Sequence, residues 1–240
     1  MSKLQTLSKN CIKNFILRID FADALPFTAI SDAIKDLFVR REERQVDGFR
    51  MRFDPARGEV VPVVEKGAIR ENLFIKADGC SLVLSPIDFS LVIGASSYIN
   101  KSVYEDILNK LTLVEWNARR VGLRYVNLFE CQKLTGVGKI LNVPYSEVIK
   151  RLATCEVASR VICVQSRTTS NGHVQKVQFG IPNSGFPRRI LNHDILLDID
   201  AFYVGAIKSN ECCEMVEELN HEAYDIFTEL VTERQIGMMQ

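Results

Sequence analysis

Asn14-Phe-Ile-Leu-Arg-Ile-Asp-Phe21 opens the part of the chain that decides the fold, and a related stretch, Gly122-Leu-Arg-Tyr-Val-Asn127, opens its second half. Apolar and polar side chains alternate in the first stretch, as they do in a β-strand with one buried face. A shorter helical pattern, several strand-like runs and a long amphipathic helix follow each stretch. The same order of secondary-structure elements therefore occurs twice along the chain, and we predict two related halves.

The first half, residues 12–120, reads as a strand over residues 14–21, a helix, several antiparallel strands and a second helix. The first helix is predicted from apolar residues at helical spacing, namely Ile30, Ile34, Leu37 and Phe38. Glycine-containing breaks separate the β-rich runs, which cover residues 72–77, 81–85 and 89–93. The second helix has one apolar face, made of Val103, Ile107, Leu111, Val114 and Ala118.

The second half, residues 121–236, repeats this order. A strand over residues 122–130 leads to a short helix that carries Val148, Ile149 and Leu152. The β-rich runs cover residues 157–167, 173–181 and 195–204, and Ser170-Asn171-Gly172 between the first two is a strong hairpin signal. The apolar face of the last helix consists of Val216, Leu219, Ala223, Ile226, Phe227 and Leu230.

These patterns predict an α+β protein with a mainly antiparallel sheet. The sheet is built from two related β-α-β(3-4)-α halves, with the helices packed on one of its faces. No low-complexity linker separates the halves, so we predict a single domain over residues 1–240 that contains two pseudo-repeats.

The composition does not favour nucleic acid or a membrane as a partner, and it bears on where in the cell the protein is expected. The 240 residues are 47% hydrophobic and 25% charged, and 30 basic side chains balance 30 acidic ones. A chain without net charge has no global field that would draw it onto nucleic acid or an anionic membrane. We find no signal-peptide-like or bilayer-length apolar run, so we expect a cytoplasmic protein without membrane association. The seven cysteines lack the spacing of a secreted scaffold and are expected to be reduced.

Charged residues recur on alternate positions of the predicted strands. Arg18 and Asp20 share one strand face, and Asp198 and Asp200 share another. In the strand that opens the second half, Arg124 shares a face with Val126, whereas Asn127 shares the other face with Tyr125. We expect the charges to converge on the open sheet face, and the predicted binding residues are Arg18, Asp20, Arg124, Asn127, Asp198 and Asp200.

Two interpretations of these residues stay open. In the first, they form cross-strand ion pairs on a solvated face, each worth only ~0.2–1 kcal/mol. In the second, the arginines form a clamp for an anion or a carboxylate, and the aspartates hold the clamp in place.

Other motifs fail on their spacing. Gly136-Val-Gly-Lys139 suggests a phosphate loop, but the positions of the first glycine and of the hydroxyl are occupied by Lys133 and Ile140. His221 and Glu222 resemble part of a zinc-protease helix without its second histidine. The sequence therefore assigns no catalytic residue, no metal ligand and no cofactor.

The remaining histidines and basic residues have ordinary explanations. His173 lies at the predicted hairpin turn and His193 lies in a loop, where polar residues are common. Two groups, Arg188-Arg189 and Arg119-Arg120 with Arg124, are local basic patches. They lack the interleaved aromatic residues of a nucleic-acid surface.

The strand motifs 14–21, 122–127 and Leu197-Asp-Ile-Asp200, with His221, Phe227 and Thr232 after them, resemble a sporadically distributed and uncharacterised family of prokaryotic proteins. The resemblance spans nearly the whole chain, with a departure at residues 135–139. It implies no cofactor and no catalytic residue, while the patchy distribution implies accessory genes in mobile or defence-related neighbourhoods. The element order also resembles the TATA-binding-protein and helix-grip architectures, in which helices lie on the convex side of a curved sheet.

We therefore expect a binding or regulatory module that engages a protein partner or a small anionic ligand through the open polar sheet face. A nucleic-acid-associated accessory protein is the first alternative, and an enzyme with Asp or His acid-base chemistry is the second. A homodimer is a further expectation, formed either through the last helix or through an unpaired sheet edge.

Overall fold

A computed structural model describes most of the chain. The described residues are 11–23, 27–45, 48–54, 59–65, 69–75, 80–85, 90–95, 101–153, 160–188 and 192–239. Parts of the predicted strand runs, residues 76–77, 89 and 157–159, lie outside these ranges.

A nine-stranded antiparallel sheet dominates the structure, with the strand order β2-β5-β6-β7-β1-β8-β11-β10-β9. Its strands are β1 (Ile12–Phe21), β2 (Phe38–Gln45), β5 (Ile69–Ile75), β6 (Cys80–Ser85), β7 (Ser90–Ala95), β8 (Asn117–Phe129), β9 (Val161–Thr168), β10 (Val174–Ile181) and β11 (Ile195–Lys208). The predictions of an α+β fold and of a mainly antiparallel sheet are confirmed.

Both halves of the chain contribute to this one sheet. The opening strands of the halves, β1 and β8, pair at its centre, and each is flanked by the last strand of its own half, β7 or β11. From there the order continues outward to β2 on one side and to β9 on the other. This arrangement is the one expected of two related halves, whose common origin stays a prediction.

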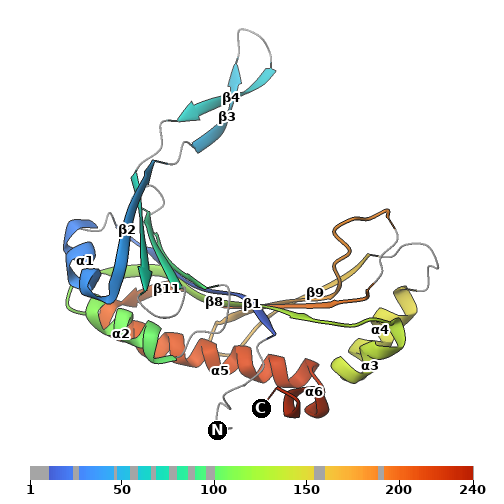
Figure 1. Cartoon of the computed structure of the whole chain (residues 1–240). Coiled ribbons are helices and arrows are strands. Elements are labelled where there is room, and N and C mark those ends of the chain that lie inside the picture. The colour runs from blue at the N-terminus through green and yellow to red at the C-terminus, as the bar shows by residue number, and fades with distance from the viewer. Residues whose placement is uncertain are drawn as a thin grey trace.

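Six helices and three 3-10 turns complete the described structure. The α-helices are α1 (Phe27–Ile34), α2 (Lys101–Leu111), α3 (Val137–Ile140), α4 (Tyr145–Leu152), α5 (Cys212–Leu230) and α6 (Glu233–Gly237). The 3-10 turns are η1 (Lys35–Leu37), η2 (Leu134–Gly136) and η3 (Ser209–Glu211). In Figure 1 the sheet is curved, with α2 and α5 along its convex side.

Alternation along the central strands builds the core beneath the sheet. Leu17, Ile19 and Phe21 of β1 are fully buried on the helix side. Helix α5 packs on β8 and β11, and its predicted apolar face is buried throughout. Strand residues between these core positions therefore point to the side that the helices leave open.

The helix predicted after residue 102 is shorter than expected. It ends at Leu111, and the prediction that its apolar face extends to Val114 and Ala118 is wrong. The indole Nε1 of Trp116 donates a hydrogen bond to the Leu111 carbonyl oxygen at 3.0 Å, which satisfies an acceptor at the helix end. Ala118 then pairs with Phe21 in the sheet. The helical spacing of apolar residues continues past Leu111, but these residues do not extend the helix because Ala118 pairs in the sheet.

Two further strand regions differ from the prediction. Phe38, expected at the end of the first helix, instead begins β2. Strands β3 (Gly48–Asp54) and β4 (Glu59–Glu65) form a separate two-stranded sheet, which projects from the body as an arm in Figure 1. The hairpin at residues 170–172 is confirmed, with Gly172 at φ 78° and its N–H donating to the Thr169 carbonyl oxygen.

Candidate functional site

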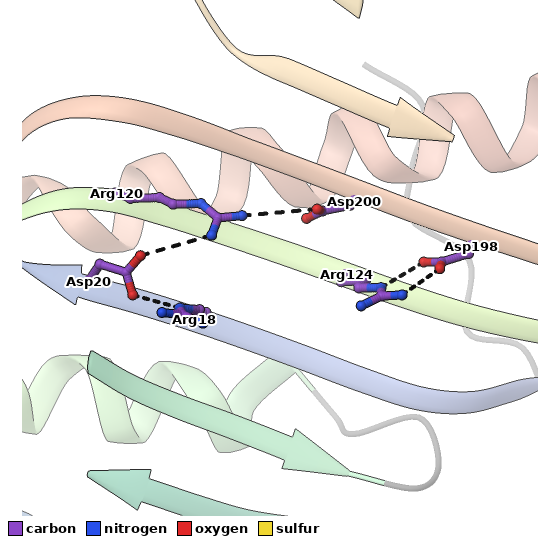
Figure 2. A network of polar contacts seen from close by, with 6 residues as sticks. All are labelled: Arg18, Asp20, Arg120, Arg124, Asp198 and Asp200. Atoms are coloured by element: carbon purple, nitrogen blue, oxygen red, sulfur yellow. Dashed lines mark hydrogen bonds and ion pairs between the residues drawn. The ribbon is translucent and has the colours of Figure 1, made fainter. Parts of the chain in front are cut away.

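Six charged side chains form a network on the open face of the three central strands. Arg18 and Asp20 come from β1, Arg120 and Arg124 from β8, and Asp198 and Asp200 from β11. Figure 2 shows these side chains above the strands, with the helices behind the sheet. The five charged residues that the sequence nominated therefore lie on one face.

The shortest contacts join one arginine to one aspartate. Arg124 holds Asp198 side-on, with Nε to Oδ1 at 2.8 Å and Nη2 to Oδ2 at 2.6 Å. Arg18 donates from Nε to Asp20 Oδ1 at 2.6 Å. Charge-assisted hydrogen bonds of this kind, and bidentate ones above all, are the stronger class of polar contact.

Arg120 lies between the Arg18–Asp20 pair and Asp200, at longer range from both carboxylates. Its guanidinium lies 3.9 Å from Asp20 and 4.0 Å from Asp200, which is beyond a direct hydrogen bond. The guanidinium also lies over the ring of Phe202, 4.5 Å from the centroid. Arg120 therefore acts on the two carboxylates as a nearby charge, and the aromatic ring stabilises its position.

Gly122 makes room for this stacking. It lies opposite Phe202 in the pairing of β8 with β11, and a Cβ at this position would lie 2.9 Å from the Phe202 Cβ. Real Cβ contacts are longer than this, so the close approach of the two strands requires glycine here. The glycine between Arg120 and Arg124 therefore contributes to the site through packing.

Exposure differs between the two charge types. The side chains of Asp20 and Asp198 are each 8% exposed, whereas those of Arg18 and Arg124 are 39% and 45% exposed. The network balances three positive charges with three negative ones, but its guanidinium groups face solvent more than its best-paired carboxylates do. The solvent-accessible part of the network therefore carries more positive than negative charge, although the network as a whole has equal numbers of both.

The surroundings shift the acidity of two members. Hydrogen bonding to Asp198 raises the pKa of the Arg124 guanidinium above its ordinary value, which keeps the group charged. Burial raises the pKa of the Asp200 carboxyl, against the opposing effect of Arg120 and Arg124. Asp200 therefore carries its charge at a desolvation cost that its long contact with Arg120 does not fully offset.

Asn127, the sixth nominated residue, does not join the network. It is buried on the helix side of β8, as its alternation with Arg124 requires, and its Nδ2 donates to the Leu197 carbonyl oxygen at 3.1 Å. Its Oδ1 accepts a hydrogen bond from the Cys11 thiol at 3.3 Å. An amide in this position satisfies buried polar groups and does not line the open face.

Sequence alone predicts Arg120 only as part of a basic patch. The signal that identifies it is the spacing of Arg120 and Arg124, which places both on one face of a strand. Lys176 of β10 was also missed, and it lies opposite Asp200 in the sheet pairing. Only knowledge of the strand order places Lys176 beside the network.

A second polar cluster lies on the helix side, between β10 and α5. His173, 2% exposed, makes a 2.7 Å hydrogen bond from Nδ1 to Glu222, whose other carboxylate oxygen accepts from Gln175 at 2.8 Å. Arg167 donates to Gln175 at 2.6 Å and lies 3.5 Å from Glu229, beside a small pocket. His173 therefore lies at the hairpin turn, as predicted, where its carbonyl oxygen accepts from Thr169 N–H, and its buried imidazole joins a polar cluster that holds α5 against the sheet.

The other sequence motifs do not assemble a second site. Residues 136–139 lie in the short η2 and α3 helices, and His221 is 37% exposed and 3.9 Å from Glu217. Within the described ranges, no three His, Cys, Asp or Glu side chains come together as a metal site would require. Arg188 is exposed in a turn, and its neighbour Arg189 lies outside the described residues.

No described helix combines the length and the apolar character that crossing a bilayer requires. Comparisons with protein-family models, with curated proteins and with solved structures gave no match. The resemblance to the prokaryotic family therefore stays a prediction.

Proposed function

We propose that this protein is a binding module whose open sheet face receives an anionic group, a carboxylate or a phosphate, from a small ligand or a protein partner. The observation that carries the proposal is the unequal exposure within the ion network. Arginines that are one third to one half exposed stand over aspartates that are almost fully buried.

The geometry of Arg124 supports this function. Side-on pairing with Asp198 uses the Nε–H and one of the two N–H groups of Nη2. The end-on edge of a guanidinium, formed by its two terminal nitrogens, is a second fork that matches the two oxygens of a carboxylate or phosphate. Asp198 orients the guanidinium, so an incoming anion does not have to order it.

The neighbouring cations support the same ligand chemistry. Arg120 lies in the same strand, and Lys176 lies across Asp200 from Arg124. Asp200 is the carboxylate without a short partner among the contacts of the network, and its partly desolvated charge limits how many negative charges the face accepts. These features favour a ligand group with one or two negative charges over an extended polyanion.

Anion titration of the folded full-length chain tests the proposal. We expect inorganic phosphate or citrate to shift the arginine side-chain resonances of the wild-type protein in NMR spectra, and we expect the Arg18→Ala and Arg124→Ala double variant to lose the response. Arg124→Lys is the matched control, because it keeps the charge but loses the fork; we expect at least a tenfold weaker affinity, about 1.4 kcal/mol. A double variant that folds normally and binds both anions as the wild type does would overturn the proposal.

Nucleic-acid binding is distinguished from binding of a single anionic group by its dependence on salt concentration. Phosphate-backbone binding weakens steeply as ionic strength rises. The test is a mobility shift with single- or double-stranded oligonucleotides. A shift that is strong at low salt and depends on Arg120 and Arg124 would favour the nucleic-acid alternative over the anion-group proposal. Affinity capture from the native host, compared between wild type and the double variant, would then identify the partner.

A further inference from the structure

The two edges of the nine-stranded sheet differ in charge. Edge strand β2 has five consecutive charged residues, Arg40, Arg41, Glu42, Glu43 and Arg44, which is how proteins discourage another strand from pairing. Edge strand β9, Val-Ile-Cys-Val-Gln-Ser-Arg-Thr, has only Arg167. Among the described strands, β9 pairs with β10 alone. Its other edge lacks the charges that protect β2.

Two apolar side chains of β9 lie exposed at this edge. Val164 is 59% exposed and Ile162 is 36% exposed. Val164 is paired with Gln178, which shares the open sheet face with Asp198. Exposed β-branched residues on an unprotected edge strand are typical of a strand that accepts a pairing partner.

The sequence of β9 is complementary to itself. If two copies pair antiparallel about Cys163, Ile162 of each copy lies opposite Val164 of the other, and Val161 lies opposite Gln165. Residues 161–165 bring no charge into this stretch, and Arg167 falls beyond it. A self-paired strand of this kind is the isologous contact of a two-fold dimer.

The apolar face of α5 is not available for a dimer contact. The sequence suggested that the apolar last helix supports dimerisation, but Val216, Leu219 and Phe227 of α5 are all buried within the molecule. The same face cannot also pack against a second copy.

We propose that the protein forms a homodimer through antiparallel pairing of β9 with β9, in the register that places Ile162 opposite Val164. A two-fold axis perpendicular to the sheet at this edge makes one continuous sheet and keeps both open faces on the same side. The dimer therefore presents two copies of the ion network to one ligand-bearing surface, which would strengthen binding to a partner with two anionic groups.

Light scattering coupled to size-exclusion chromatography tests the dimer with the full-length chain. The pairing stretch is short, so we expect a dissociation constant of roughly 1–100 µM and a mass that rises with concentration toward twice the chain mass of 27.2 kDa. Val164→Lys places a charge on the edge, and we expect it to stay monomeric over the same range. Gln178→Lys is the matched control, one strand inward in the same row, and we expect it to dimerise as the wild type does.

A mixing experiment tests the register. In the proposed pairing, the lysine introduced by Val164→Lys in one copy lies opposite the glutamate introduced by Ile162→Glu in the other. We expect each variant alone to be monomeric and their mixture to form a heterodimer. A wild-type protein that stays monomeric up to about 1 mM would overturn the proposal. Equal dimerisation of Val164→Lys and Gln178→Lys, or a mixture that stays monomeric, would overturn it too.

Discussion

At the scale of single residues, two aspartates on one strand have opposite energetic roles. Asp198 and Asp200 share a face of β11, but Asp198 is held by two short hydrogen bonds and Asp200 only by a 4.0 Å contact. A buried carboxylate is stabilised by good partners and penalised without them. The two positions therefore predict opposite effects of the same isosteric substitution.

Asp198→Asn should destabilise the protein. The amide keeps the shape of the side chain but cannot accept both guanidinium hydrogen bonds, and one of its groups faces Arg124 as a competing donor. We expect the free energy of unfolding to fall by about 1–3 kcal/mol. Urea denaturation followed by circular dichroism measures the loss, and an unchanged midpoint would show that the bidentate pair contributes nothing.

Asp200→Asn should stabilise the protein at neutral pH. Burial raises the pKa of Asp200 in the folded state above its ordinary value of 3.8, so the ionised carboxylate is less favourable in the folded chain than in the unfolded one. The penalty is complete above the folded-state pKa, decreases as pH falls through it, and is absent below the unfolded value. Thermal unfolding of both proteins from pH 7 down to pH 3.5 should show a gain at pH 7 that vanishes at the acid end. A gain that is independent of pH would contradict this account.

At the scale of secondary-structure elements, the attachment of β9 depends on one backbone position. Gly180 of β10 has φ 147°, and a Cβ there would lie 1.9 Å from the carbonyl oxygen of Val161 at the start of β9. This conformation and this approach both exclude a side chain. The edge strand is therefore held where glycine permits two backbones to meet.

Gly180→Ala should detach the start of β9. Backbone strain alone costs ~1–3 kcal/mol, and the steric clash adds to it, so we expect the free energy of unfolding to fall by at least about 3 kcal/mol. Hydrogen exchange should quicken in residues 161–168 before it quickens in β1 or β8. Gly185→Ala is the control, since its nearest neighbouring atom would lie 3.8 Å from the new methyl group. Equal exchange rates in the two variants would contradict the assigned role of Gly180.

At the scale of the whole molecule, the arm of β3 and β4 is separate from the main sheet. Gln45, the last residue of β2, pairs with Ile69, the first residue of β5, so the main sheet is complete without the arm. An isolated two-stranded hairpin contributes little stability of its own. The body should therefore fold without it.

Replacing residues 46–68 by Asn-Gly tests this separation, because a two-residue turn joins antiparallel strands directly. We expect a folded protein with a thermal midpoint within a few degrees of the wild type. Circular dichroism and calorimetry measure the outcome, and replacement of residues 170–172 by three alanines serves as a contrast that disturbs a turn inside the main sheet. Loss of folding without the arm would show that the arm packs against the body.

The sequence alone placed the charged side chains correctly wherever a strand has strict alternation. Arg18 with Asp20, and Asp198 with Asp200, lie on the face that period two assigns to them, because successive side chains of any strand point to opposite sides. The same rule places Asn127 on the helix side, where it is buried, so the prediction that it lines the open face is wrong. Alternation gives only the face, however, and the partners on that face depend on which strands are neighbours.

Local chemistry was therefore sufficient to establish most of the element types, the antiparallel sheet and the sidedness of its strands, because each of these depends on residues a few positions apart. Tertiary structure decided the rest: that Arg124 binds Asp198, that Arg120 lies between two aspartates, and that β9 is the edge without charge protection. These contacts join residues far apart in the chain, and they exist only once strand order and register bring the strands together. The early end of α2 has the same cause, since pairing of β8 in the sheet outweighs the helical pattern that runs past Leu111.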